Sequence, residues 1–194
     1  MLPLVLIAMA ASIIVVGGTI RIHDAGESCP DWPQCFGTWG FMVDESEQAA
    51  YWEANPDQID SRGADHRYTI FEIFVEWFHR MLVGIIAIPI LINAVAAHRL
   101  KSEYGTGLRN LAVVSGVLLV VQAIAGAVTV FFDNADWTVA MHLSLASIFI
   151  SLLVWQYIAM RVKEGATWNF LNTSRSFLLR QKKRLINILS LIHI

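Results

Sequence analysis

Four long runs of apolar residues divide this chain and limit what it can fold into. They cover about residues 2–20, 70–97, 111–132 and 137–160. The hydrocarbon core of a bilayer is about 30 Å thick and takes roughly 20 apolar residues as a helix. Within lipid only helices and closed barrels satisfy every backbone polar group, and runs of this length predict helices. The sequence therefore predicts an all-α polytopic membrane protein, a four-helix transmembrane bundle.

The composition agrees with this prediction. Of the 194 residues 56% are hydrophobic and 15% charged, whereas a soluble chain carries about a quarter charged residues. These values argue against a disordered chain, a nucleic-acid binder and a disulfide-dense secreted domain. The first run resembles a signal peptide in its position, but no Lys or Arg precedes it and no Ala-x-Ala site closes it. We therefore interpret it as the first transmembrane helix.

Charge is distributed unevenly between the segments outside the four runs. The long segment 21–69 holds ten Asp and Glu against three Arg, and the segment 161–194 holds seven Lys and Arg against one Glu. The positive-inside rule then places both termini in the cytoplasm and residues 21–69 in an outer loop. We expect the bacterial inner (plasma) membrane, or the mitochondrial inner membrane in a eukaryote. Residues 161–194 are expected to be a basic cytoplasmic tail on anionic lipid, or a truncated continuation.

The two cysteines, Cys29 and Cys35, lie just after the first apolar run, on the side expected to be oxidising. Thiols tend to pair there, and Pro30 and Pro33 restrict the backbone between them, so we expect a disulfide. The pair is either a staple of the loop or a redox-active dithiol. Zinc is disfavoured because a structural site takes four Cys or His ligands.

Ionisable residues interrupt the second apolar run near its start. Glu72, Glu76 and His79 stand at i, i+4 and i+7, so they share one face of a helix, and Arg80 follows directly. An ionisable group at mid-bilayer costs from about 2.5 kcal/mol upward, and such groups are rare unless paired or functional. Glu76 and His79 are therefore candidate functional residues, whereas Glu72 lies nearer the interface and Arg80 is long enough to snorkel.

His142 is the second ionisable residue within an apolar run. A lone transmembrane His is more often an interhelical hydrogen-bonding residue than a ligand. With about 1.5 Å of rise per residue, however, His142 and His79 lie at similar depths in the outer half of their helices. Two imidazoles at one depth on two helices suit the axial positions of one haem iron, and predict a membrane b-haem site. No metal role is expected for the other histidines, His23, His66, His98 and His193.

Five stretches together resemble the haem A synthase family of cytochrome oxidase assembly proteins. They are Gly-Gly-Thr-Ile-Arg at 17–21, Ser-Cys-Pro-Asp-Trp-Pro-Gln-Cys-Phe-Gly at 28–37, Glu-Trp-Phe-His-Arg at 76–80, Gln-Ala-Ile-Ala-Gly-Ala-Val-Thr-Val at 122–130, and His-Leu at 142–143. They follow one another in the family order. The cysteine loop together with the Glu-x-x-His-Arg helix is the most specific part, and its cysteines match the loop pair of one class of these enzymes.

The resemblance implies an oxidoreductase that converts haem O to haem A by oxidising a porphyrin methyl group to a formyl group. It implies haem b as cofactor and haem O as substrate. The expected partners are membrane lipid, haem O synthase and a haem-copper oxidase of the same pathway, and no nucleic acid.

The resemblance also implies roles for individual residues. His79 and His142 correspond to the pair that ligates haem iron, and Glu76 corresponds to the catalytic carboxylate. An anion in a low dielectric acts strongly at short range, so Glu76 is expected to serve as a base or to stabilise positive charge at the oxidised carbon. Arg80 is expected to pair with a haem propionate.

Typical members of this family have eight spans in two four-helix halves, each with its own histidine pair, and the chain resembles the amino-terminal half. It is then either a short form that dimerises or a copy without its second half, and a lone half could bind haem without turning it over.

Two other functions stay open. A simple b-type cytochrome would carry electrons without chemistry on the porphyrin. A disulfide-forming thiol oxidoreductase would use Cys29 and Cys35 as its active pair, although relay through such an enzyme usually needs two pairs.

Overall fold

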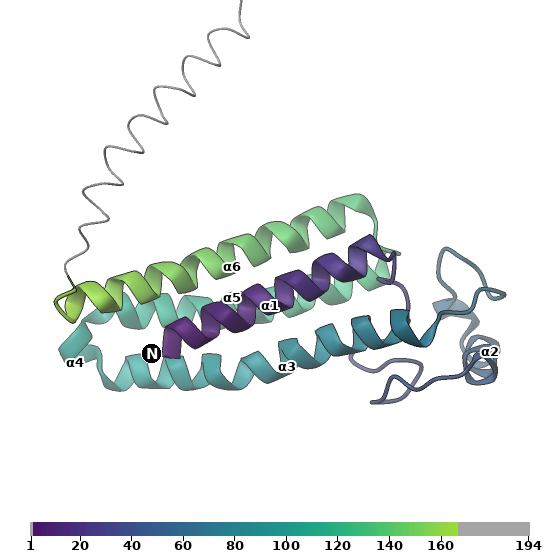
Figure 1. Cartoon of the computed structure of the whole chain (residues 1–194), viewed down its shortest axis with the longest axis horizontal. Coiled ribbons are helices and arrows are strands. Elements are labelled where there is room, and N and C mark those ends of the chain that lie inside the picture. Colours follow the sequence, from purple (N-terminus) through teal and green to yellow (C-terminus); the bar gives the residue numbers. More distant parts are fainter. Residues whose placement is uncertain (1, 167–194) are drawn as a thin grey trace, which may run out of the picture. The chain divides into compact units, whose positions relative to one another are not determined.

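A computed structural model describes residues 2–166 of the chain. Its elements, in chain order, are the helices α1 (Leu2–Ile22) and α2 (Glu45–Ala54), a 3₁₀ turn η1 (Pro56–Gln58), and the helices α3 (Ile70–Arg99), α4 (Lys101–Tyr104), α5 (Thr106–Phe131) and α6 (Asp136–Lys163). Figure 1 shows α1, α3, α5 and α6 as the long helices. The described part of the chain contains no β-strand.

These observations confirm the all-α fold class. The four long helices are long and apolar enough to cross a membrane. Most of them extend beyond the predicted spans; α5, for example, begins at Thr106 rather than at residue 111. Polar residues can continue a helix past the edge of an apolar run. The run therefore predicts the part of a helix that spans lipid better than it predicts where the helix begins and ends.

The chain forms two compact units, residues 1–157 and 158–194. The second unit is described only as far as residue 166, where it holds the last turn of α6 and an ion pair of 2.7 Å between Arg161 and Glu164. The predicted basic tail falls mostly on residues 167–194, which lie outside the described residues.

Within residues 1–157, α3 packs against both α1 and α5. One apolar cluster joins all four long helices: Leu6, Ala10, Ile86, Ile90, Leu119, Phe149 and Leu153. A buried pair of side-chain amides also links α3 to α6, with Asn93 Nδ2 donating to Gln156 Oε1 at 3.0 Å and Gln156 Nε2 donating to Asn93 Oδ1 at 2.9 Å. Because each amide satisfies the other, the pair fixes the register of the two helices without leaving a polar group unpaired.

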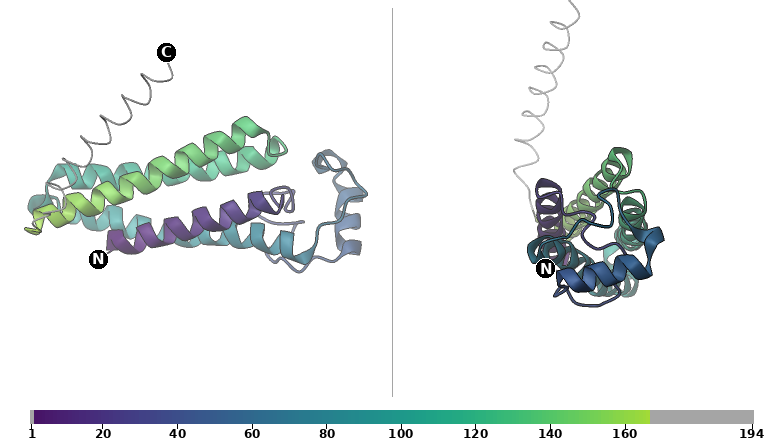
Figure 2. Two further views of the ribbon diagram at one scale, coloured as in Figure 1. Left: turned by 45° about the horizontal axis from the view of Figure 1, so that its top comes forward. Right: turned by 90° about the vertical axis from the view of Figure 1, so that its right-hand side faces the viewer.

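The predicted outer loop is a folded cap. It contains α2, a helix that the sequence analysis missed and that lies across the end of α3 in Figure 2. Asp44 and Glu47 form a capping box at its start, which satisfies the first backbone donors. A second cluster joins this cap to α3: Cys29, Cys35, Phe36, Val43, Trp52, Tyr68 and Ile73.

Arg62 ties the two ends of the cap together. Its guanidinium lies 2.9 Å from Asp24 and over the ring of Tyr68, at 5.2 Å from the ring centroid. The Glu27 carboxylate is 3.9 Å away. Burial raises the pKa of Glu27, and a hydrogen bond from Ser61 partly opposes this effect. These contacts hold the chain after α1 beside the chain that leads into α3.

Glu72 has a structural role at the start of α3. The Glu72 carboxylate accepts hydrogen bonds from the backbone N–H and the hydroxyl of Thr69, at 2.8 and 2.7 Å, and its own N–H donates to the Thr69 hydroxyl. This capping box explains an acidic residue at the edge of an apolar helix without a chemical function.

Candidate functional site

The Cys29–Cys35 disulfide closes a short loop against α3. The structure pairs the two cysteines, as predicted, with Cα atoms 4.5 Å apart. Neither residue is exposed to solvent. A redox relay needs a disulfide that another thiol or cofactor can reach, so this burial favours the loop staple.

The Glu76 carboxylate joins α3 to the start of this loop. It is 4% exposed. Its Oε2 atom accepts a hydrogen bond from the Cys29 backbone N–H at 3.1 Å and lies 3.0 Å from the Ser28 hydroxyl. That hydroxyl can also donate to the carbonyls of Ala25, at 2.7 Å, and Glu72, at 2.9 Å. The Oε1 atom of Glu76 accepts a hydrogen bond from Arg80 Nη2 at 2.5 Å. These donors, one of them charged, stabilise the ionised form of a carboxylate that is removed from water.

Arg80 holds the other side of the loop. Its guanidinium donates to the backbone carbonyls of Cys29 at 2.7 Å and Gln34 at 2.5 Å, and to the carbonyl of Asp31. The side chain is 9% exposed, because the loop covers its guanidinium. Glu76 and Arg80 therefore form a buried ion pair that also forms hydrogen bonds with the disulfide loop.

His79 lies one turn beyond Glu76 on α3 and faces α1. A Cβ atom added to Gly17 would lie 3.3 Å from His79 Nε2, so the glycine lets the backbone of α1 come close to the ring. Among the described residues, none forms a hydrogen bond with the ring nitrogens of His79.

His142 occupies a similar position between α6 and α5. A Cβ atom added to Gly126 would lie 3.1 Å from His142 Cε1. Gln122, one turn before Gly126, places Nε2 3.2 Å from Nδ1 and 3.3 Å from Nε2 of the His142 ring, and donates to the His142 carbonyl at 3.0 Å. Neither Gln122 nor Ser28 was predicted as a site residue, although both belong to the stretches that resemble the family. A glutamine within an apolar helix could have indicated Gln122. No feature of the sequence indicated Ser28.

These residues fit a haem group on three grounds. Two imidazoles are a common axial ligand pair for haem iron. Each imidazole faces a glycine where a Cβ atom would crowd it, at 3.3 Å for Gly17 and 3.1 Å for Gly126. The Gln122 Oε1 atom beside His142 is buried and has no hydrogen-bond partner, which is unusual for a polar atom in a protein interior.

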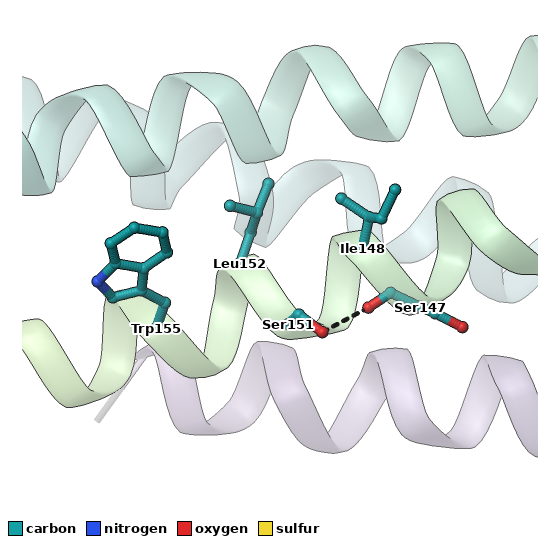
Figure 3. A pocket seen from close by; sticks show the side chains of 5 residues that line it. All are labelled: Ser147, Ile148, Ser151, Leu152 and Trp155. Carbon is teal, nitrogen blue, oxygen red and sulfur yellow. Dashed lines mark hydrogen bonds between the residues drawn. The ribbon is translucent and has the colours of Figure 1, made fainter. Parts of the chain in front are cut away.

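The structure thus brings Glu76, Arg80 and the cysteine pair together in one network, and keeps His79 and His142 in separate contacts with α1 and α5. A pocket of about 370 Å³ lies elsewhere on α6, lined by Ser147, Ile148, Ser151, Leu152 and Trp155 (Figure 3). The Ser151 hydroxyl donates to the Ser147 carbonyl at 2.7 Å within the helix. No predicted site residue lines this pocket, so it is not the candidate site.

Fold and site together define a helical protein of the multi-pass membrane class with two glycine-flanked histidines and a disulfide-closed cap. Comparison with known proteins gives the family. Residues 1–194 match the family described as cytochrome oxidase assembly protein, and the chain belongs to this family.

Curated relatives of this chain carry the name haem A synthase. That of Geobacillus thermodenitrificans is 26% identical over 137 residues, which cover 70% of this chain and 35% of the relative. That of Geobacillus kaustophilus is 27% identical, covering 72% of this chain and 37% of the relative. That of Paracoccus denitrificans is 25% identical, covering 84% and 45%. The chain thus spans between a third and a half of these relatives. No solved structure matches it.

Proposed function

We propose that this chain takes part in haem A synthesis for cytochrome oxidase assembly, by oxidation of the methyl group of haem O to the formyl group of haem A. The observation that carries the proposal is the pair His79 and His142, each against a glycine of a neighbouring helix, in a chain whose relatives are named haem A synthase. Membership of an assembly family supports the same pathway.

In this proposal His79 and His142 hold the haem, either haem b as cofactor or haem O as substrate. The iron, when bound, supplies the redox chemistry. The residues of the chain keep the group in place: Gly17 and Gly126 let the backbones of α1 and α5 come close to the two rings, which restricts how the rings can turn. An apolar site of this kind strengthens each electrostatic interaction inside it.

Glu76 is proposed as the catalytic carboxylate. The donors around it, from Ser28, Cys29 and Arg80, favour the ionised form of the carboxylate. Such a group can accept a proton or stabilise positive charge that develops on a carbon nearby. Because Ser28 and Arg80 hold the carboxylate, they act as positioning residues for Glu76.

Arg80 is proposed to contact a haem propionate as well. Its hydrogen bonds with the loop and with Glu76 all use Nη1 and Nη2. The Nε–H is then the donor left for a carboxylate, since a guanidinium offers donors on all three nitrogens. Replacement of Arg80 by Ala should lower the haem content of purified protein, and unchanged content would remove this role.

We propose that both termini face the cytoplasm and that the cap, residues 21–69, lies on the outer side of an inner membrane. The charge difference between the cap and the segments on the other side supports this orientation. Cysteine labelling tests this orientation. In a variant without Cys29 and Cys35, a single cysteine is placed either in the cap or after α3, and intact cells are treated with a membrane-impermeant thiol reagent. The cap position should react in intact cells, and labelling of only the other position would reverse the topology.

We further propose that turnover requires a second four-helix half in addition to the four long helices described here. Support comes from the relatives, of which this chain covers 35% to 45%. Haem O synthase and the haem-copper oxidase are the proposed pathway partners.

The second candidate function is a b-type cytochrome. It is favoured by the ligand set, since an iron with two imidazoles has no open position and suits electron transfer. The thiol oxidoreductase is disfavoured by the complete burial of Cys29 and Cys35.

Expression of the chain beside a haem O producer, followed by mass analysis of the extracted porphyrins, separates the first two functions. The proposed synthase yields the formyl product and, at lower abundance, the alcohol. Haem bound without any change in porphyrin mass would favour the cytochrome.

A further inference from the structure

The Gln122 side chain contacts the His142 ring in a way that a neutral ring can satisfy and a doubly protonated ring cannot. Gln122 Nε2 lies at nearly equal distances, 3.2 and 3.3 Å, from the two ring nitrogens, and donates at 3.0 Å to the His142 carbonyl. An amide NH₂ group is a donor only. It therefore suits a ring nitrogen that carries a lone pair and not one that carries hydrogen.

Iron ligation would change which group faces the amide. A histidine binds a metal through its unprotonated nitrogen and keeps hydrogen on the other, and that N–H almost always donates to an acceptor. The NH₂ group of Gln122 cannot be this acceptor. The Gln122 Oε1 atom can: it belongs to the same amide, is buried, and has no hydrogen-bond partner.

The hydrogen-bonding surroundings of the His142 ring are simple. Gln122 is the one side chain in the described part of the chain that forms a hydrogen-bonding contact with the His142 ring nitrogens.

A second buried amide pair shows how unusual the Gln122 oxygen is. Asn93 and Gln156 also join two helices, but each amide oxygen there accepts a hydrogen bond from the other residue, at 2.9 and 3.0 Å. Both amide oxygens of that pair are therefore satisfied. The orphaned oxygen of Gln122 lies instead beside a candidate ligand.

We propose that Gln122 is a positioning residue that orients His142 for haem. When one nitrogen of His142 binds iron, the Gln122 amide turns so that Oε1 accepts the hydrogen bond from the N–H on the other nitrogen. This inference rests on the proposed function, because it requires haem ligation by His142. It adds that α5 contributes to the electronic properties of the haem through Gln122.

The test measures the reduction potential and the electron paramagnetic resonance spectrum of the haem-loaded chain, for Gln122→Leu, Gln122→Glu and the wild type. A stronger acceptor makes the imidazole a better electron donor and stabilises the oxidised iron. The potential should therefore be lowest for Gln122→Glu, intermediate for the wild type and highest for Gln122→Leu. Gln156→Leu removes a buried amide that does not touch His142 and should leave the potential at the wild-type value.

Equal potentials in the three Gln122 forms, or a shift of the same size in Gln156→Leu, would overturn the inference. If Gln122→Leu does not fold, Gln122→Asn withdraws the amide by one carbon and should shift the potential in the same direction. His142→Ala separates the two proposals: loss of the bis-histidine spectrum in that variant supports ligation by His142, whatever the Gln122 variants do. An unchanged spectrum in His142→Ala would reject the ligation itself.

Discussion

The surroundings of His79 and of His142 differ. An ion pair and a disulfide loop lie near His79, whereas one neutral amide lies near His142. Near His79, the neighbouring residues Glu76 and Arg80 reach out of the bundle to a loop closed by a disulfide. Near His142, a single neutral side chain, Gln122, makes the polar contact, and Gly126 lies directly against the ring.

This difference indicates that the two histidines are positioned independently. A buried ion pair with many hydrogen bonds is costly to break, because removal of one partner leaves an uncompensated charge. A single amide can turn at much lower cost. We therefore expect the α3 side to keep its geometry whether or not haem is bound, and the α6 side to adjust.

Glu76→Gln tests the α3 side most strongly. The substitution keeps the size of the side chain but removes its charge, and with it the ion pair to Arg80. If the carboxylate takes part in proton transfer, formyl product should fall by about 100-fold or more, while haem content stays near the wild-type level. Mass analysis of extracted porphyrins measures both, and an unchanged yield of haem A would remove Glu76 from the mechanism.

Removal of the disulfide should act on the same side. The double variant Cys29→Ser, Cys35→Ser loses the closure of a short loop, which stabilises the folded chain by about 2 kcal/mol. Unfolding of the protein in denaturant, with and without reductant for the wild type, measures this value. The ligation of haem by His142 should not change in this variant. Loss of the spectrum of haem ligated by His142 would show that the surroundings of His79 and His142 are coupled.

Glycine substitutions compare the two histidines directly. Gly126→Ala would place a Cβ atom 3.1 Å from His142, Gly17→Ala would place one 3.3 Å from His79, and Gly18→Ala meets nothing within 4 Å. Crowding of this kind costs about 1 kcal/mol or more, which corresponds to about fivefold or more in haem affinity. In a haem titration, Gly126→Ala should have the lowest haem affinity and Gly17→Ala the next lowest. The haem affinity of Gly18→Ala should equal that of the wild type. An equal effect of all three would point to helix propensity instead.

Ser28→Ala should have the smallest effect. It removes one donor to Glu76 while the Cys29 N–H and Arg80 remain. One hydrogen bond of this kind contributes about 1 kcal/mol to folding, and more when the partner is charged. Ser144→Ala is the control, since its hydroxyl bonds only within α6. Equal unfolding free energies for the two variants would contradict a positioning role for Ser28.

The sequence predicted the four long helices because a bilayer demands a length of apolar chain that is visible without any partner. It also predicted the disulfide, because the two cysteines and two prolines are close together in one segment. It missed α2, whose residues show no such pattern, and whose place depends on contacts of Trp52 and Gln48 with distant residues.

The site was predictable only in part. Glu76 and His79 stood out as ionisable residues in an apolar helix. Their hydrogen-bond partners did not, because Ser28 and the loop carbonyls are far from them along the chain and meet them only after folding. Glu72 shared the same helical face, yet it caps the helix. Spacing alone does not separate these two roles.

Ligation of haem by both histidines is the central claim, and the absorption and magnetic circular dichroism spectra of the haem-loaded chain test it most directly. We expect a low-spin spectrum of an iron with two imidazoles for the wild type, and its loss in both His79→Ala and His142→Ala. A spectrum that survives either substitution, or a purified chain that takes up no haem at all, would contradict it.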